Sequence, residues 1–209
     1  MIDNKNFIFS TAYFPPISYF KLLDKANVTF IERHENFVKQ TYRNRCKILA
    51  ANGVISLIVP VEKNSGNKIN ICDVKIDYAT NWQKQHLKSI ESAYRNSPFY
   101  ELYIDDFITI FNKKTKFLFD FNLEITYKLL DFFDIEKQIK FNNDFEKTPK
   151  NLIDYRNKIH PKKQYLELKK ETEHPYYQVF SNKFSFHSDL SSMDLLFNLG
   201  TESFLYLNK

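Results

Sequence analysis

Two strand-like segments separated by one helix-like segment lie within residues 7–31, and this pattern constrains the fold more than any other feature. Residues 7–13 form a run of aromatic and β-branched side chains, and residues 28–31 form a second run. Between them, residues 17–23 carry apolar side chains at helical spacing. The order strand, helix, strand predicts a βαβ unit, with two parallel strands and a right-handed crossover.

The segment AYFPPISYF, residues 12–20, joins the first strand to the helix. Adjacent prolines suit the first turn of a helix, where proline is tolerated and fixes the direction of the chain. In open α/β sheets, ligands bind beyond the carboxyl ends of the strands. We therefore expect Tyr13, Pro15 and Tyr19 to line a substrate site at this edge, together with Glu32 at the end of the second strand.

A β-hairpin is predicted next, because two strand-like runs flank the dipeptide Asn52-Gly53. On a strand, Arg43, Arg45 and Lys47 project from one face and Asn44 projects from the other. A row of cations can bind a phosphate or a carboxylate, so Arg43, Asn44 and Arg45 are candidate substrate-binding residues. The alternative is a solvated hairpin face, and a shift of one residue would exchange the two faces.

Three helices are expected in the middle of the chain. The stretch Thr80-Asn-Trp-Gln83 has the form of a capping box and starts a helix that runs to about residue 96. Ser97-Pro98 is expected to cap and start the next helix, which runs to about residue 112. Apolar residues at helical spacing predict a third, amphipathic helix over residues 117–133.

The helical and strand patterns weaken from about residue 140 to residue 187, which predicts an irregular segment that wraps over the core. Within it, DYRNKIHPKK (residues 154–163) is a dense polar cluster. Arg156 and Lys162 could complete an anion site if the segment passes over the strand edge; a solvated loop is the alternative. Two short helices broken at Gly200 are expected to close the chain.

His86 is the candidate catalytic residue. It shares one stripe of its predicted helix with Trp82, Ile90 and Ala93, whereas charged residues occupy the opposite face. A histidine that faces inward can act as a general base or acid. It can equally be a core histidine with satisfied hydrogen bonds, and the spacing by itself favours this second interpretation.

Composition and missing motifs argue against several functional classes. The net charge is +5, but the lysine pairs are scattered along the chain, so nucleic-acid binding is not indicated. The two cysteines form no CxxC pair, the histidines show no short metal-ligand spacing, and three glycines cannot supply a phosphate-binding loop. We expect no metal and identify no cofactor. The absence of a long apolar run and the polar N-terminus predict a cytoplasmic chain without a transmembrane segment.

Several stretches, in the same order, resemble those of the WbqC-like proteins: AYFPPISYFKLLDKANV, YRNRCKIL with ANG and ISLIVPV, WQKQHLKSIESAY, SPFYE, RNKIHPK, YYQVF and DLLFNLG. The resemblance spans about residues 7–207 and implies a bacterial protein associated with surface-polysaccharide biosynthesis. The family is described as having a histidine of functional importance. His86 fits that histidine, so the resemblance favours a functional role for it, although it carries over no established reaction.

The first strand, loop and helix also resemble, more loosely, those of HxGH nucleotidylyltransferases. Here Ile17-Ser-Tyr-Phe20 stands in place of HxGH, so nucleotidyl transfer is not implied.

Together these features predict an α/β fold: an N-terminal βαβ unit in a small mixed, Rossmann-like sheet with a β-hairpin, followed by a mainly helical C-terminal half. We expect residues 1–209 to form a single domain with an α/β part (1–80), a helical part (81–135) and an irregular wrap with two C-terminal helices (136–209).

The expected function is group transfer in the synthesis of a bacterial surface-polysaccharide precursor of the O-antigen type. The substrate would be a phosphorylated or nucleotide-linked sugar, with His86 as general base, and other glycan-biosynthesis enzymes are candidate partners. The alternative is a non-catalytic protein that binds a glycan intermediate or assembles the enzymes of the pathway. Docking to a membrane surface through residues 117–133 is disfavoured, because that helix is rich in acidic residues.

Overall fold

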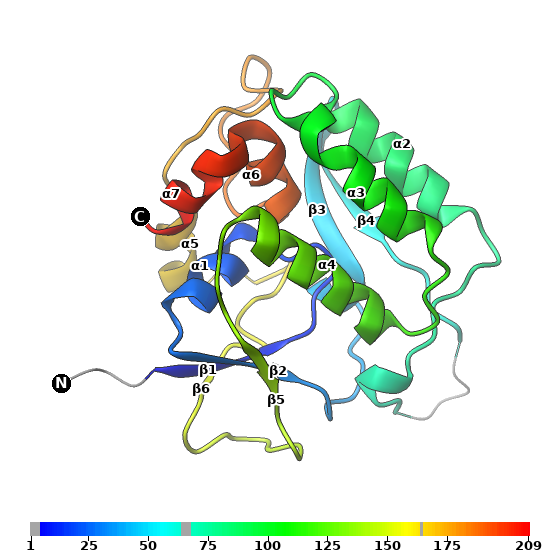
Figure 1. The fold of residues 1–209 in the computed structure, drawn as a ribbon, viewed down its shortest axis with the longest axis vertical. Helices are drawn as coiled ribbons and strands as arrows, with labels where there is room; N and C mark the ends of the chain where they lie inside the picture. Colours follow the sequence, from blue (N-terminus) through cyan, green and yellow to red (C-terminus); the bar gives the residue numbers. More distant parts are fainter. Residues whose placement is uncertain (1–4, 64–67, 164) are drawn as a thin grey trace.

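A small parallel sheet forms one end of the molecule, as the computed structural model shows for residues 5–63, 68–163 and 165–209 (Figure 1). Its strands lie in the order β5-β2-β1-β6, and every neighbouring pair is parallel. The strands are β1 (Asn6–Ser10), β2 (Val28–Glu32), β5 (Ile139–Phe141) and β6 (Ile153–Asp154). The fold is therefore mixed α/β, with helices concentrated in the later part of the chain.

The predicted βαβ unit is confirmed. Helix α1 (Ile17–Lys25) connects β1 to β2, and Phe9 lies opposite Ile31 in the parallel register. The side chains of residues 7–10 are all buried, as expected for a strand in the middle of a sheet. Pro16 is the N-cap residue of α1 and cannot supply a side-chain cap, so the Asp189 carboxylate accepts a 2.8 Å hydrogen bond from the Ser18 amide instead.

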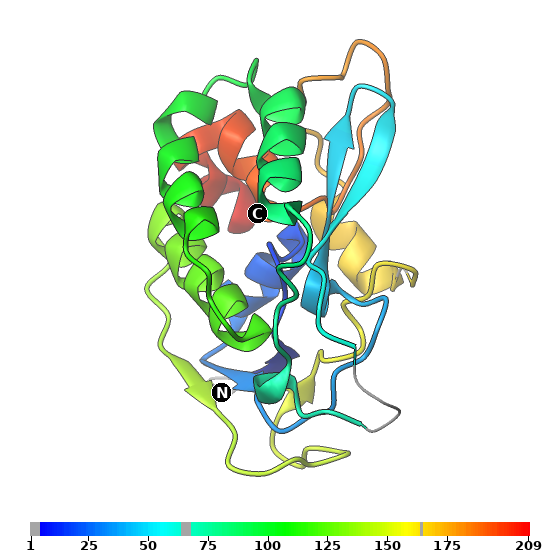
Figure 2. The same cartoon turned by 90° about the vertical axis from the view of Figure 1, so that its right-hand side faces the viewer.

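The predicted hairpin is also confirmed. Strands β3 (Arg45–Ala50) and β4 (Gly53–Ile58) pair antiparallel, and Ala50 lies opposite Gly53, which leaves a two-residue loop. One face of the hairpin is covered by α2 (Trp82–Tyr94) (Figure 2).

The expected row of three cations on this hairpin is wrong at its first member. Arg43 precedes the strand, in the 3-10 turn η1 (Tyr42–Asn44), and it points into the protein. The turn is favoured because the Thr41 hydroxyl accepts a hydrogen bond from the Arg43 amide. Only Arg45 and Lys47 share a face of the strand.

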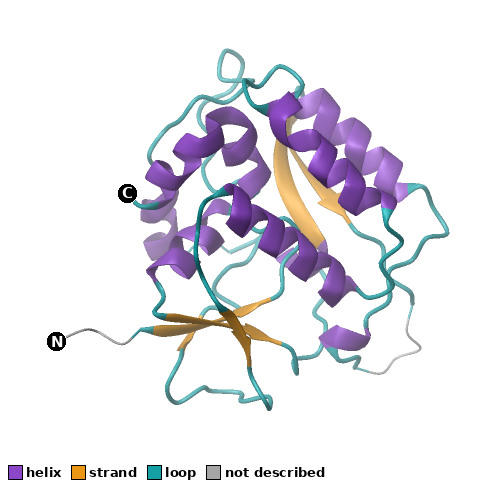
Figure 3. Ribbon diagram, viewed as in Figure 1, coloured by secondary structure: helices purple, strands orange, loops and turns teal. Residues whose placement is uncertain are grey.

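The helical part contains α2, α3 (Tyr100–Asn112) and α4 (Leu118–Phe132), at the predicted places (Figure 3). The predicted capping box at the start of α2 does not form: the N-cap residue Asn81 makes no side-chain cap, and the Gln83 amide donates a 2.6 Å hydrogen bond to the Phe111 carbonyl oxygen on α3. Helix α3 begins at Tyr100 rather than at Ser97-Pro98, because the Ser97 hydroxyl donates backwards to the Tyr94 carbonyl oxygen at 2.6 Å.

The segment predicted to be an irregular wrap contributes to the sheet. Strand β6 lies within it and β5 lies at its start, and they form the two outer strands. Strands of two and three residues are too short to show an alternating pattern, which explains why the sequence did not predict them. The remaining elements of the described chain are η2 (Ile71–Asp73), which precedes α2, and α5 (Leu166–Thr172), α6 (Ser192–Leu199), η3 (Gly200–Glu202) and α7 (Ser203–Leu207), which follow β6.

Aromatic side chains dominate the core between the sheet, the hairpin and the helices. Phe14 contacts Phe107 and Phe111, with ring centroids 5.2 and 6.1 Å apart, and thereby joins the loop after β1 to α3. Within the described residues, no helix is long and apolar enough to cross a membrane.

Candidate functional site: a basic pocket beside the sheet edge

The carboxyl edge of the sheet is held by buried ion pairs. Arg43 donates from Nε to Glu35 Oε1 at 2.9 Å and from Nη2 to Glu35 Oε2 at 2.5 Å, and both side chains are less than 10% exposed. The Nη2 group also donates to the hydroxyl of Ser10, at the end of β1, over 2.6 Å. This bidentate geometry, together with the hydroxyl, engages the Nε and Nη2 groups of Arg43 within the protein.

A second buried network surrounds Arg156, which follows β6. Its Nη1 group donates to Glu32 Oε2 at 2.7 Å, and its Nε and Nη2 groups donate to Asp154 at 3.0 and 2.7 Å. Glu32 Oε1 accepts further hydrogen bonds from the Asn142 amide and the His34 backbone N–H. Burial by itself would raise the pKa of Asp154, but hydrogen bonds from Arg156 and its positive charge bring it below its ordinary value.

These two networks change the expected roles of three residues. Glu32 and Arg156 pair at the carboxyl edge, and Arg43 pairs with Glu35 beside them instead of standing in the predicted cation row on the hairpin. The two networks hold the loops after β1, β2 and β6 together. One cavity beside them measures only about 10 Å³ and leaves no room for a sugar, but Glu35, Arg43 and Arg156 also line a second cavity of about 380 Å³. Because carboxylates already bind both guanidinium groups, we regard these side chains as a scaffold for the site rather than as its ligand contacts.

The loop AYFPPISYF belongs to the core. Tyr13 is fully buried and Tyr19 is 2% exposed; the Tyr19 hydroxyl donates to the Ser10 carbonyl oxygen at 3.2 Å. Pro15 is buried as well, and its carbonyl oxygen accepts a hydrogen bond from Ser192 at the start of α6. The stiff aromatic loop thus packs β1 and α1 against the C-terminal helices.

His86 lies in this same core, on α2. Its Nδ1 is 2.8 Å from the Tyr13 hydroxyl, and its ring contacts those of Trp82 and Phe111. Burial lowers the pKa of His86 to about 4, against the opposite effect of a hydrogen bond with the backbone of Ile58. These contacts satisfy the imidazole in its neutral form and keep it among buried aromatic rings.

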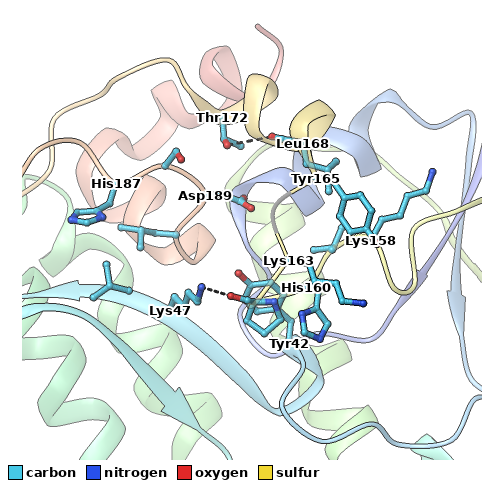
Figure 4. A pocket seen from close by; sticks show the side chains of 15 residues that line it. Tyr42, Lys47, Lys158, His160, Lys163, Tyr165, Leu168, Thr172, His187 and Asp189 are labelled. Atoms are coloured by element: carbon cyan, nitrogen blue, oxygen red, sulfur yellow. Dashed lines mark hydrogen bonds between the residues drawn. The ribbon is translucent and has the colours of Figure 1, made fainter.

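A separate cavity of about 250 Å³ lies between the hairpin, the segment after β6 and the segment before α6 (Figure 4). It is rich in basic side chains that come from parts of the chain far apart in sequence. Lys47 comes from β3, and among the residues that the structure describes one carboxylate, Asp189, faces the same cavity. The other polar and basic residues that line it are Tyr42, Lys158, His160, Lys163, Tyr165, Thr172, His187 and Ser188.

A tight turn places the basic groups of the second segment. His160 and Lys163 form a bridge across the turn, with Pro161 at the position that proline favours. Lys47 Nζ donates to the Pro161 carbonyl oxygen at 2.5 Å, which ties the turn to the hairpin. Lys162, predicted to bind the substrate, points away from the cavity and donates to the side chain of Gln40.

Asp189 joins the cavity to the start of α1. Its two carboxylate oxygens accept hydrogen bonds from the amide and the hydroxyl of Ser18, at 2.8 and 3.1 Å. Burial raises the pKa of Asp189 to about 6, although these hydrogen bonds and the charge of Lys47 act in the opposite direction. The carboxylate is thus occupied as a helix cap, and the cavity retains an excess of positive charge.

His160 is the histidine whose protonation the geometry defines best. Its Nδ1 accepts a 3.1 Å hydrogen bond from the Lys162 backbone N–H. Burial lowers the pKa of His160, and the positive charges of Lys163, Arg43 and other nearby cations lower it further. The ring is therefore neutral at neutral pH and carries its proton on Nε2.

The predicted binding residues Arg45 and Asn44 lie near the cavity without lining it. The side-chain amide of Asn44 donates to the Val59 carbonyl oxygen at 2.9 Å, and Arg45 is half-buried. Sequence reasoning named Lys47 only as a member of the cation row on the hairpin, and it missed His160 and His187 as site residues. The polar cluster at 154–163 lies in a segment that lines the cavity, whereas nothing in the sequence linked residues 187–189 to it.

Among the described residues, no group of three or more His, Cys, Asp or Glu side chains could hold a metal ion. No curated protein and no solved structure matches the chain. The sequence model of the WbqC-like protein family matches residues 11–169, which is well over half of the chain and includes the hairpin, both buried ion pairs and the turn at Pro161. The chain therefore belongs to the WbqC-like protein family.

Proposed function

We propose that the basic pocket binds a phosphorylated or nucleotide-linked sugar and that the protein is a group transferase in bacterial surface-polysaccharide precursor synthesis. The observation that carries this proposal is the convergence of basic side chains from separate segments, including Lys47, Lys163 and His187, around one cavity. Positive charge in a concave site attracts anionic ligands and holds their phosphate oxygens. Membership of the WbqC-like family supports the connection with polysaccharide synthesis.

In this proposal, Lys47 and Lys163 bind the phosphate, and His187 is the general base. His187 is half-buried at the cavity wall, and its ring contacts Phe184 at 6.1 Å between centroids. It would remove the proton from an acceptor hydroxyl as that oxygen attacks the transferred sugar, while the bond from the sugar to the phosphate oxygen breaks and the phosphate leaves with the bonding electrons. The lysines would stabilise the negative charge on the phosphate oxygens during transfer. His86, buried against Tyr13, would support the core beneath the hairpin.

A second candidate function is binding without catalysis, for example to hold a glycan intermediate for another enzyme. The absence of a recognised catalytic motif in the sequence favours it. The two functions differ at His187: a transferase needs this imidazole for turnover, whereas a binding protein needs only the charge and shape of the cavity.

Isothermal titration calorimetry with sugar phosphates and nucleotide sugars tests binding. We expect Lys47→Met and Lys163→Met each to weaken the affinity about tenfold, because each removes one charged hydrogen bond to the ligand. Lys162→Met is the matched control: it removes the same charge from the same turn, but its side chain points to Gln40. Equal losses in Lys162→Met and Lys163→Met would refute a defined site in this cavity.

Turnover is tested by mass spectrometry of reactions that contain the bound sugar phosphate and candidate acceptors. In a transferase, His187→Asn should abolish product formation and leave the affinity within about threefold of that of the wild type, because the base acts on the acceptor. Product formation that persists in His187→Asn would refute its role as the base. Binding without any product in the wild type would favour the second function.

A further inference from the structure

The geometry points to a phosphate monoester of a single sugar as the ligand of the basic pocket, with its phosphate held by Lys47, Lys163 and the Nε2–H group of His160. This inference rests on the proposed function and narrows the substrate from phosphorylated or nucleotide-linked sugars to the first class. Four features of the cavity support it: its volume, its closed inner end, the hydrogen-bond donor of His160 and the mixture of charged and apolar walls.

The volume suits one sugar ring with one phosphate. The cavity measures about 250 Å³. Pockets for drug-sized ligands span about 300–1,000 Å³, and a nucleotide sugar, with a base, two sugars and two phosphates, lies well within that size class. A nucleotide sugar would therefore have to leave much of its structure outside.

The inner end of the cavity is closed. Tyr42 and Ile159 line both this cavity and the neighbouring one of about 10 Å³. Beyond them lie the ion-paired guanidinium groups of Arg43 and Arg156, which are each less than 5% exposed. A nucleoside cannot extend in this direction unless a buried ion pair breaks, and a broken pair would leave an uncompensated charge in the core.

His160 supplies a donor that does not depend on its own positive charge. The Lys162 backbone N–H occupies Nδ1, so the proton of the neutral ring lies on Nε2 and can be donated to a phosphate oxygen. Lys47 Nζ ties down the adjacent residue Pro161, so the ring is positioned before a ligand arrives. A donor that is already in place loses little conformational entropy on binding.

The charges around His160 match a dianion. A phosphate monoester carries between one and two negative charges at neutral pH, and its second pKa is about 6. The ionisable groups that line the cavity with His160 are Tyr42, Lys47, Lys158, Lys163, Tyr165, His187 and Asp189, and further positive charge comes from Arg43, Arg45 and Lys162. Because the carboxylate of Asp189 already caps α1, the lysines remain available for the phosphate.

The remaining walls are apolar and suit the carbon faces of a sugar ring. Val54 of β4 and Tyr165 are 41% and 38% exposed, and they stand with Leu168 and Leu190 around the same cavity. Ligand sites typically combine such apolar walls with a few polar groups that fix the orientation. The polar groups of this cavity would orient the phosphate, and the apolar walls would contact the ring.

Calorimetry on the full-length protein with matched ligands tests the inference: glucose 1-phosphate, galactose 1-phosphate, UDP-glucose, UDP-galactose, UMP, inorganic phosphate and unphosphorylated glucose. We expect at least one sugar monophosphate to bind ten or more times tighter than its UDP-linked counterpart and than inorganic phosphate. Tighter binding of a UDP-sugar or of UMP would overturn the inference while leaving the proposed function intact. No binding of any phosphorylated ligand would overturn both.

The role of His160 is tested with two variants and one spectroscopic measurement. His160→Ala should weaken sugar-phosphate binding about tenfold, whereas His160→Gln, whose amide can also donate, should stay within about threefold of the wild type. Nitrogen-15 NMR of the free protein should show the His160 ring neutral and protonated at Nε2 at pH 7.5. A ring protonated at Nδ1, or equal affinities in all three proteins, would overturn this role.

Discussion

The buried Arg43–Glu35 pair allows the sharpest test of how the site is supported. Both side chains are more than nine-tenths buried, and two hydrogen bonds of 2.9 and 2.5 Å join them. Replacing Arg43 by Met leaves a carboxylate buried without its counter-ion. Breaking such a pair by removal of one partner costs about 3–5 kcal/mol. For a chain of this size, that loss lowers the melting temperature by roughly 6–20 °C.

Urea denaturation followed by circular dichroism measures this cost, and a double-mutant cycle isolates the interaction. Arg43→Met and Glu35→Gln should each lower the free energy of unfolding by several kcal/mol. The double variant should lose clearly less than the sum of the two, because no unpaired charge stays buried.

The surface pair of Lys113 and Glu124 provides the control. Its lysine is 56% exposed, and exposed pairs contribute less than about 1 kcal/mol. If Arg43→Met cost no more than Lys113→Met, Arg43 would be free to serve a ligand, and the distinction drawn above between scaffold and pocket would be wrong.

Three further predictions concern a close backbone contact and two buried carboxyl groups. Gly200→Ala should lower the free energy of unfolding by about 2–4 kcal/mol in urea denaturation, because φ is +55° and the new Cβ would lie 2.6 Å from the Phe99 ring. Gly53→Ala is the control, since Gly53 also has a positive φ but open space around it, and this variant should lose less free energy of unfolding. Equal losses in the two variants would exclude the ring contact as the cause. Burial raises the pKa of Asp194 from 3.8 to about 6, so the folded state holds the proton more tightly than the unfolded state, and the free energy of unfolding falls as pH rises from about 4 to 6. In denaturation experiments at several pH values, Asp194→Asn should remove up to about 3 kcal/mol of that fall. An unchanged pH dependence in the variant would contradict the raised pKa. Asp189→Asn removes the carboxylate of Asp189 from the cavity and keeps an oxygen for the α1 cap. The variant should bind sugar phosphate about fivefold tighter at pH 8 in calorimetry, whereas weaker binding would make Asp189 a ligand contact.

Local patterns predicted much of the fold. The βαβ unit, the hairpin at Asn52-Gly53 and helices α2 to α4 follow from side-chain periodicity and turn chemistry within short stretches. These periodic patterns are visible in the sequence because each helix or strand buries one face, whichever element it packs against. The predicted helix starts were less accurate, because the Gln83 side chain donates to a carbonyl oxygen on α3 instead of closing the capping box.

The candidate site could be located in part. Sequence reasoning placed Glu32 at the sheet edge and Arg156 there if the wrap passed over that edge, and the two side chains do form an ion pair; Arg43, predicted on the hairpin, instead pairs with Glu35. It could not show that buried carboxylates already occupy both guanidinium groups, because an arginine that binds a ligand and one that binds a glutamate look the same in a sequence. The same limit applies to His86, since helical spacing showed that it faces inward but could not name Tyr13 as its partner.

The sequence by itself determined the elements whose signals are local, and it identified the polar cluster at 154–163 as unusual. Only the tertiary structure decided that β5 and β6 complete the sheet, and that Lys47, His160 and His187 surround one cavity. Lys47 lies more than a hundred positions before His160 in the chain, and His187 comes from a third segment 27 positions after His160. Their proximity depends on long-range packing and on buried ion pairs, which leave no periodic trace in the sequence.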